Sequence, residues 1–351
     1  MTALTRPARP GEDDAAPRPL PWRRMAGVTW RQHRMTLAGV AVLLGALAVW
    51  LWTAGTPLHN TWATAAACHP ASSPSCQNLI SAFDSTATNK FMGSKGAGGV
   101  LLQLIPALIG AFAGAPVLAR ELETGTFRFA WTQGFARWRW ALAKLVLLAL
   151  ALAAATAAFG VLVSWYYQPY EGVGGQFLGL NENTPFAYGF SLREVTFPAW
   201  TLAAFAIAAL AGVLIRRVVP AIVATLVVYA GLAFAAAGLL REHYLAPLAT
   251  TRLDLPGTTT DWVLGQWFTK NGRFAFGGNP PSSILNQFCS SGKAAGPSFA
   301  PCLSPHGYVQ WTSYQPASRF WPFQWIEGGW LLALSALLIA AAIWMVHRRA
   351  A

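Results

Sequence analysis

Residues 145–165 read LVLLALALAAATAAFGVLVSW and contain no charged side chain. An α-helix rises about 1.5 Å per residue, so about 20 residues cross the roughly 30 Å hydrocarbon core of a bilayer. The core of a soluble domain does not need an apolar block of this length. The stretch therefore predicts a helix that crosses a membrane.

Five further stretches share this character, and they lie on both sides of the first. They cover residues 36–53, 99–118, 197–215, 218–240 and 329–346. Arg216, Arg217 and Pro220 predict a tight turn between the fourth and fifth spans, because two arginines inside one continuous span are unfavourable. The pattern indicates an all-α membrane protein with six transmembrane helices.

The charge content supports this class. Only 11% of the 351 residues are charged, whereas about a quarter are charged in an ordinary soluble domain. The formal net charge is +12, but the basic residues flank the apolar stretches. This placement indicates membrane orientation and contact with lipids, and it argues against nucleic-acid binding.

Basic residues gather before the first span, between the second and third, between the fourth and fifth, and after the sixth. They are Arg23, Arg24, Arg31, Arg34, Arg120, Arg128, Arg137, Arg139, Lys144, Arg216, Arg217, Arg348 and Arg349. Positive residues mark the cytoplasmic side, so we expect a multi-pass plasma-membrane protein with both termini inside. Residues 1–20 are expected to be a disordered cytoplasmic tail. Residues 21–351 form the membrane domain, with extracytoplasmic loops 54–98, 166–196 and 241–327.

The chain has four cysteines, all in loops that this topology places outside. An even number on the oxidising face predicts two disulfides. Three pairings are possible, and we favour Cys68–Cys76 with Cys289–Cys302 because each pair closes a short Pro/Ser/Gly-rich loop. A metal site at Cys68, His69 and Cys76 is the alternative, although structural zinc usually takes four ligands.

Polar side chains are scarce inside the spans: Gln103, Thr156, Ser164 and Ser335 are the main ones. They either form hydrogen bonds between helices or, as we consider for Gln103 and Ser164, line a translocation path. No phosphate-binding loop of the form GxxxxGK[ST] occurs. ATP-driven work would therefore need a separate chain to bind ATP and Mg²⁺, and we expect no cofactor in this one.

Residues 21–34, PWRRMAGVTWRQHR, precede the first span. On a helix, Trp22, Met25 and Trp30 share one face, and arginines occupy another. The three arginines of that second face are Arg23, Arg31 and Arg34. The pattern is typical of a helix lying in the inner membrane interface; a simple positive anchor is the alternative.

Residues 119–126, ARELETGT, follow the second span. Carboxylates on so short a segment can fix the register of a partner through ion pairs. An ordinary hairpin connection with balanced charge is the alternative.

This segment resembles the coupling segment of type-2 ABC transporter permeases, which commonly show an A-R-E-x-E-x-G-T pattern there. The stretches 28–34, 126–145 and 314–327 resemble an actinobacterial branch of that family. The resemblance implies six spans, a connecting helix before the first span, a large outer loop before the sixth, and two permease subunits paired with two ATPase subunits. Carried over, the residues docking on the ATPase are Arg120, Glu121, Glu123, Gly125 and Thr126.

The last outer loop, residues 241–327, is rich in aromatic residues. We expect a helix-like run from Asp261 to Phe268 and a small disulfide-closed subdomain. Trp321, Phe323 and Trp325 fit an interfacial aromatic belt, or a lid over a pathway.

Three functions remain open. The leading one is the permease subunit of an ABC exporter, with a second copy or a homologue supplying six more spans, because the chain has no internal repeat. A non-transporting mechanical relay or resistance subunit of the same complex is the second. The third is a membrane enzyme, whose candidate residues His59, His69, Asp261 and His306 have no known catalytic spacing.

Overall fold

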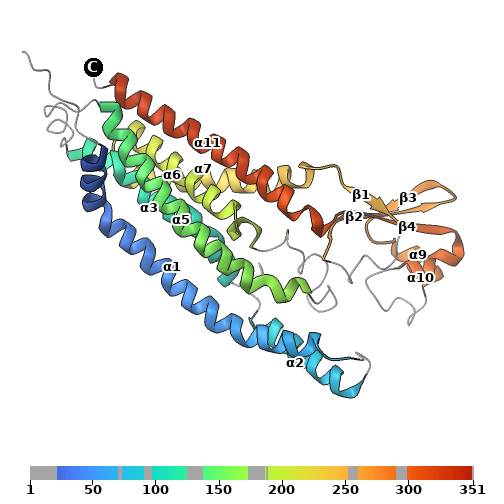
Figure 1. Cartoon of the computed structure of the whole chain (residues 1–351). Coiled ribbons are helices and arrows are strands. Elements are labelled where there is room, and N and C mark those ends of the chain that lie inside the picture. The colour runs from blue at the N-terminus through green and yellow to red at the C-terminus, as the bar shows by residue number, and fades with distance from the viewer. Residues whose placement is uncertain are drawn as a thin grey trace, which may run out of the picture.

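The structure is a computed structural model that describes residues 22–69, 73–90, 97–124, 137–172, 186, 189–251, 260–289 and 299–349. Six helices in this part are long and apolar enough to cross a membrane, which confirms the predicted spans. They are α1 (Trp22–Ala66), α3 (Ala97–Thr124), α5 (Arg137–Gly172), α6 (Thr196–Ile215), α7 (Val218–Ala235) and α11 (Phe320–Arg349). The six form one elongated bundle (Figure 1).

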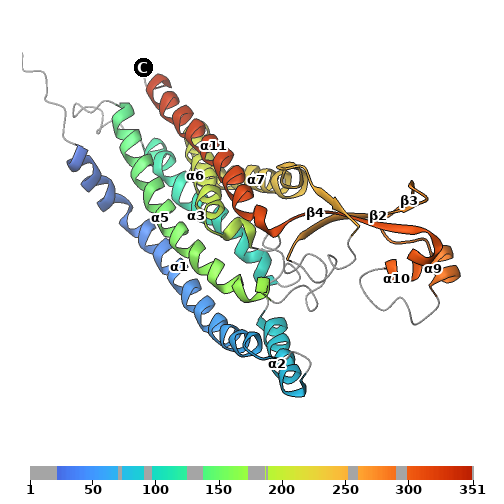
Figure 2. The same cartoon turned by 45° about the vertical axis from the view of Figure 1, so that its right-hand side comes forward.

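The two ends of the bundle differ. The start of α1 and the C-terminal end of α11 lie at one end, whereas α2 (Pro74–Lys90) and the sheet lie at the other (Figures 1 and 2). Alternating crossings by six spans require this arrangement. The cytoplasmic location of the first end stays a prediction from the arginines of the sequence.

Helix α6 occupies the centre of the bundle and packs against α3, α5, α7 and α11. Its closest neighbour is α3, because two glycines of α3 face small residues of α6. A Cβ atom at Gly110 would lie 2.4 Å from the Cβ of Ala204, and one at Gly114 would lie 2.5 Å from the carbonyl oxygen of Phe205 and 2.8 Å from the Cβ of Ala208. In lipid, such contacts between small residues drive helix association, because apolar side chains gain little by leaving the bilayer.

Helices α1 and α7 lie at the edge of the bundle. Helix α1 has 45 residues and is therefore about 68 Å long, so it extends beyond a bilayer. The predicted interfacial segment runs into the first span as part of this single helix. Trp30, Arg31 and Arg34 are exposed on it, and the side chains of Trp22, Arg23 and Met25 lie outside the described part.

The turn between α6 and α7 occurs where the sequence predicts it. Helix α6 ends at Ile215, Arg216 takes a left-handed conformation with φ of 57°, and α7 begins at Val218. The N–H of Arg216 donates to the carbonyl oxygen of Gly212, which closes the last turn of α6.

The outer loop between α7 and α11 contains a sheet rather than a helical core. Its antiparallel strands follow the order β1-β4-β2-β3. The bounds are β1 (Leu248–Thr250), β2 (Trp262–Lys270), β3 (Arg273–Gly277) and β4 (Tyr308–Gln315). The helix-like run predicted over residues 261–268 is therefore wrong, because β2 hydrogen-bonds to strands on both of its edges and its aromatic and β-branched side chains suit a pleated surface.

Short elements complete the described chain. They are η1 (Phe190–Leu192), η2 (Ala236–Leu240), η3 (Arg241–His243), α9 (Ser282–Phe288), α10 (Ala300–Leu303), η4 (Ser304–His306) and η5 (Ala317–Arg319).

The disulfides are Cys68–Cys76 and Cys289–Cys302, which confirms the predicted local pairing. The first connects the residues after α1 to α2, so the thiols that the metal alternative required are joined to each other. The second ties α10 to the end of α9 and packs against Phe268 of β2. Both lie at the end of the bundle opposite the C-terminus.

We expect Gly110→Ala to destabilise the purified protein by about 1–3 kcal/mol, because the backbone of α6 blocks the added methyl group. The matched control is Gly231→Ala in α7, where no atom lies within 4 Å of the added Cβ, and alanine is the better helix former. Thermal unfolding in detergent measures both. Equal shifts in the two variants would contradict the proposed role of the α3–α6 contact.

Candidate functional sites at the two ends of the bundle

The segment with the A-R-E-x-E-x-G-T pattern forms the end of α3. Arg120, Glu121 and Glu123 lie on the last helical turns, whereas Gly125 and Thr126 lie outside the described residues. Arg120 and Glu123 are exposed. Glu121 is largely covered, since only 13% of its side chain is accessible.

The carboxylate of Glu121 joins three helices. It accepts a hydrogen bond of 2.8 Å from Nε2 of Gln32 in α1, and it forms an ion pair with Lys144 in α5, whose side chain is 4% exposed. The ammonium group of Lys144 also lies 4.3 Å from the ring centre of Trp140. A buried pair of this kind is costly to break, because each group would leave the other unpaired.

Glu123 points to a different helix. Its Oε2 accepts a hydrogen bond of 3.4 Å from the backbone N–H of Val218, the first residue of α7. A carboxylate is favourable there because the first N–H groups of a helix have no partner within the helix. The end of α3 therefore contacts α1, α5 and α7 at one end of the bundle.

The sequence suggested that both carboxylates are free to pair with another chain. Instead, the structure engages Glu121 within its own chain and leaves Arg120 and Glu123 exposed. Sequence reasoning missed Gln32 and Lys144 as partners of Glu121, since the pair Gln32–Glu121 is 89 residues apart. Docking through this segment stays a prediction.

A second polar cluster lies at the opposite end, around Glu327 of α11. The carboxylate is fully buried and accepts two hydrogen bonds from Arg241 of η3, at 2.9 Å from Nε and 2.8 Å from Nη2. It accepts two more, from Nε1 of Trp200 in α6 at 2.9 Å and from the hydroxyl of Tyr244 at 3.2 Å. We call these four residues the outer clamp.

The outer clamp ties three helices together, because its members come from α6, α11 and the turn that ends α7. Burial and the Glu327 carboxylate raise the pKa of the Tyr244 phenol, so the hydroxyl remains a donor at neutral pH. Nε1 of Trp330 donates to the same hydroxyl at 3.1 Å.

An edge-to-face ring pair and two cation–ring contacts extend this cluster. Arg241 lies 4.3 Å from the ring centre of Phe190, the ring of Phe190 lies 5.8 Å from that of Phe320, and Arg193 lies 4.7 Å from Phe320. Nε of Arg193 donates to the hydroxyl of Ser164 at 3.2 Å, and Ser164 also bonds the carboxylate of Glu194.

The two predicted path-lining residues have different surroundings. Ser164 hydrogen-bonds Arg193 and Glu194, which lie between η1 and α6, whereas Gln103 is exposed on α3. Of the outer aromatic residues, Trp321 and Trp325 are 51% and 62% exposed, as expected for an interfacial aromatic belt. Phe323 is buried and belongs to the packed core.

The outer clamp was missed by sequence reasoning, which counted Arg241 as a loop residue and began the last span after Glu327. The sequence did contain a signal for this pair, because Arg241 follows the apolar stretch 218–240 and Glu327, of opposite charge, precedes the apolar stretch 329–346. The candidate residues of an outer enzyme site have separate local partners. His59 stacks on Trp165, Asp261 accepts the N–H of Ala317, and the tilted rings of His306 and Phe288 have centres 4.2 Å apart.

Comparison with known proteins gives one match. Residues 41–241 match the family described as ABC-2 membrane transporter related. This range covers more than half of the chain and includes part of the first span, the second to fifth predicted spans, the segment at the end of α3 and Arg241 of the outer clamp. No curated protein and no solved structure matches the chain.

We expect charge reversal to separate an internal role of Glu121 from an external one. Glu121→Lys should lower the thermal stability of the isolated chain, because two ammonium groups would then face each other in a covered site. The double variant Glu121→Lys with Lys144→Glu should recover at least half of the loss. Arg34→Glu, an exposed charge reversal on α1, is the matched control, with a change within about 0.5 kcal/mol. An unaffected Glu121→Lys protein would exclude the internal role.

We expect Glu327→Gln to cost about 3–5 kcal/mol, because it leaves the guanidinium of Arg241 buried without its counter-charge. The combined variant Glu327→Gln with Arg241→Gln should be more stable than either single variant, since no unpaired charge remains. Chemical unfolding in detergent micelles measures the difference. Strictly additive losses would show that the two residues do not act as a pair.

Proposed function

The chain belongs to the ABC-2 membrane transporter related family, and we propose that it is the membrane-spanning permease subunit of an ATP-driven exporter. Membership indicates a multi-pass membrane subunit that is not itself an enzyme, surrounded by lipid and served by an ABC ATP-binding partner. In this proposal the partner binds ATP and Mg²⁺ and this chain carries the movement.

The contact with the ATPase is the segment at residues 119–126. The observation that carries this assignment is the set of contacts made by Glu121 and Glu123 with α1, α5 and α7. A displacement of the end of α3 would be transmitted to those three helices through these polar contacts and to α6 through the contacts of Gly110 and Gly114. Arg120 and Glu123 remain exposed beside these contacts and are available to a partner.

A second copy or a homologue completes the pathway. The edge of the bundle offers an apolar face on α7, where Val219, Val223 and Val227 recur every four residues and are 70%, 55% and 68% exposed. This spacing places them on one side of the helix. Gln103 is exposed on α3 and remains our candidate for a polar group lining a path between copies.

A mechanical relay without transport is the second candidate, and the outer sheet favours it. Strand β4 leads through η5 directly into α11, so movement of α11 would be carried to the sheet. The two candidates differ in whether inverted vesicles accumulate a solute when ATP is supplied.

We expect the pair of changes Arg120→Glu and Glu123→Lys to weaken association with the ATP-binding subunit at least tenfold. Breaking close ion pairs at a protein interface typically costs about 2–5 kcal/mol. The measurement is copurification and ATP hydrolysis of the complex reconstituted in liposomes. Arg348→Glu is the control, because it is exposed at the same end of the bundle but outside the segment. Wild-type association and hydrolysis in the double variant would contradict docking at this site.

A further inference from the structure

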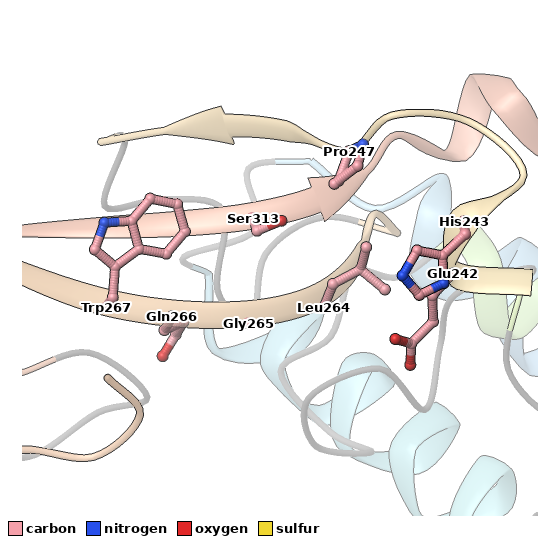
Figure 3. Close-up of a pocket in the computed structure, with 8 residues that line it drawn as sticks. All are labelled: Glu242, His243, Pro247, Leu264, Gly265, Gln266, Trp267 and Ser313. Carbon is pink, nitrogen blue, oxygen red and sulfur yellow. The ribbon is translucent and has the colours of Figure 1, made fainter. Parts of the chain in front are cut away.

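An open pocket of about 330 Å³, which we call the cavity, lies where the outer end of α7 meets the sheet (Figure 3). Its volume is at the lower end of the roughly 300–1,000 Å³ of ordinary ligand sites, so it suits a small molecule. Figure 3 shows Glu242 and His243 at one end of the group of lining residues and Trp267 at the other, with β2 between them. The polar lining residues further include Gln266 of β2 and Ser313 of β4.

Several of these polar groups have unused hydrogen-bonding capacity. The carboxylate of Glu242 is exposed and makes no ion pair or hydrogen bond with the described part of the chain. Nε2 of Gln266 is buried and has no hydrogen-bond partner there. His243 uses Nδ1 on the carbonyl oxygen of Leu239 at 2.9 Å, which leaves Nε2 for a ligand.

The aromatic wall adds a flat apolar surface. Trp267 stacks on Trp311 with ring centres 6.1 Å apart and an interplanar angle of 6°. A carboxylate attracts a cation, an indole ring offers a flat apolar surface to a ligand ring, and amide, imidazole and hydroxyl groups exchange hydrogen bonds with alcohols. One small ligand class satisfies all of these groups: a ring or chain that carries both a primary amine and hydroxyl groups.

We propose that this cavity is a binding site for a small hydroxylated primary amine of the amino-sugar type. Its ammonium group pairs with Glu242 at one end of the cavity, its apolar face packs toward Trp267 at the other end, and its hydroxyl groups bond Gln266, Ser313 and His243. The proposal goes beyond the permease function and does not rest on it, because the site lies on the outer sheet and needs no second chain.

The cavity lies next to the outer clamp, so a bound ligand could affect the helices that the clamp joins. Glu242 and His243 belong to η3, and the first residue of η3 is Arg241 of the outer clamp. A ligand held by Glu242 therefore sits on the same helical turn that ties α7 to α6 and α11.

The test is titration calorimetry on the purified full-length chain in detergent, with glucosamine as the probe. Glucose and N-acetylglucosamine lack the charge, and cyclohexylamine lacks the hydroxyl groups. We expect glucosamine to bind at least about tenfold more tightly than each comparator, since one charged hydrogen bond is worth roughly that factor. Glu242→Gln should lower the affinity for glucosamine about tenfold.

The matched control is Asp261→Asn, which removes one negative charge from the same outer region while keeping an acceptor for the N–H of Ala317. It should leave glucosamine binding unchanged. Absence of saturable binding, equal binding of glucose and glucosamine, or equal losses in Glu242→Gln and Asp261→Asn would each overturn the proposal. Because the assay contains no ATPase, these outcomes leave the permease proposal intact.

Discussion

Close contact between Gly110 and Gly114 of α3 and the small residues of α6 is the constraint on which the rest of the bundle depends. It brings two backbones together without large side chains between them, and α6 then offers its other sides to α5, α7 and α11. A bilayer provides no hydrophobic driving force between helices, so this dense packing has to supply much of the association.

Polar interactions reinforce that packing at the two ends of the bundle. Glu121 joins α1, α3 and α5 at one end, and Glu327 joins α6, α11 and the end of α7 at the other. Gln324 adds to the interactions around Glu327. Its Oε1 accepts the N–H of Thr196 at 3.0 Å, and its Nε2 donates to the carbonyl oxygen of Phe190. This distribution suits a subunit that transmits movement, because helices with apolar middles and tied ends can shift as units.

Local signals in the sequence predicted those parts of the fold that depend on nearby residues. Span length is a matter of consecutive apolar residues, and the turn at Arg216 and Arg217 interrupts them directly. The disulfides close loops with separations of 8 and 13 residues, so proximity along the chain already favoured them. The strand β2 was mistaken for a helix although Asn271 and Gly272, which follow it, are a local signal of the hairpin to β3. Its other partner, β4, lies about 40 residues away, and no local pattern indicates that pairing.

The sequence by itself determined that this chain has six membrane spans, where its disulfides form, and which end of the bundle carries the arginines. Each depends on hydrophobic length, compartment or charge, and these properties can be counted along the chain. Only the tertiary structure decided that Glu121 bonds within its own chain, that Arg241 meets Glu327 across 86 residues, and that Glu242, Gln266 and Trp267 line one cavity. A charged residue near a span end has many possible partners, and helix packing alone selects among them.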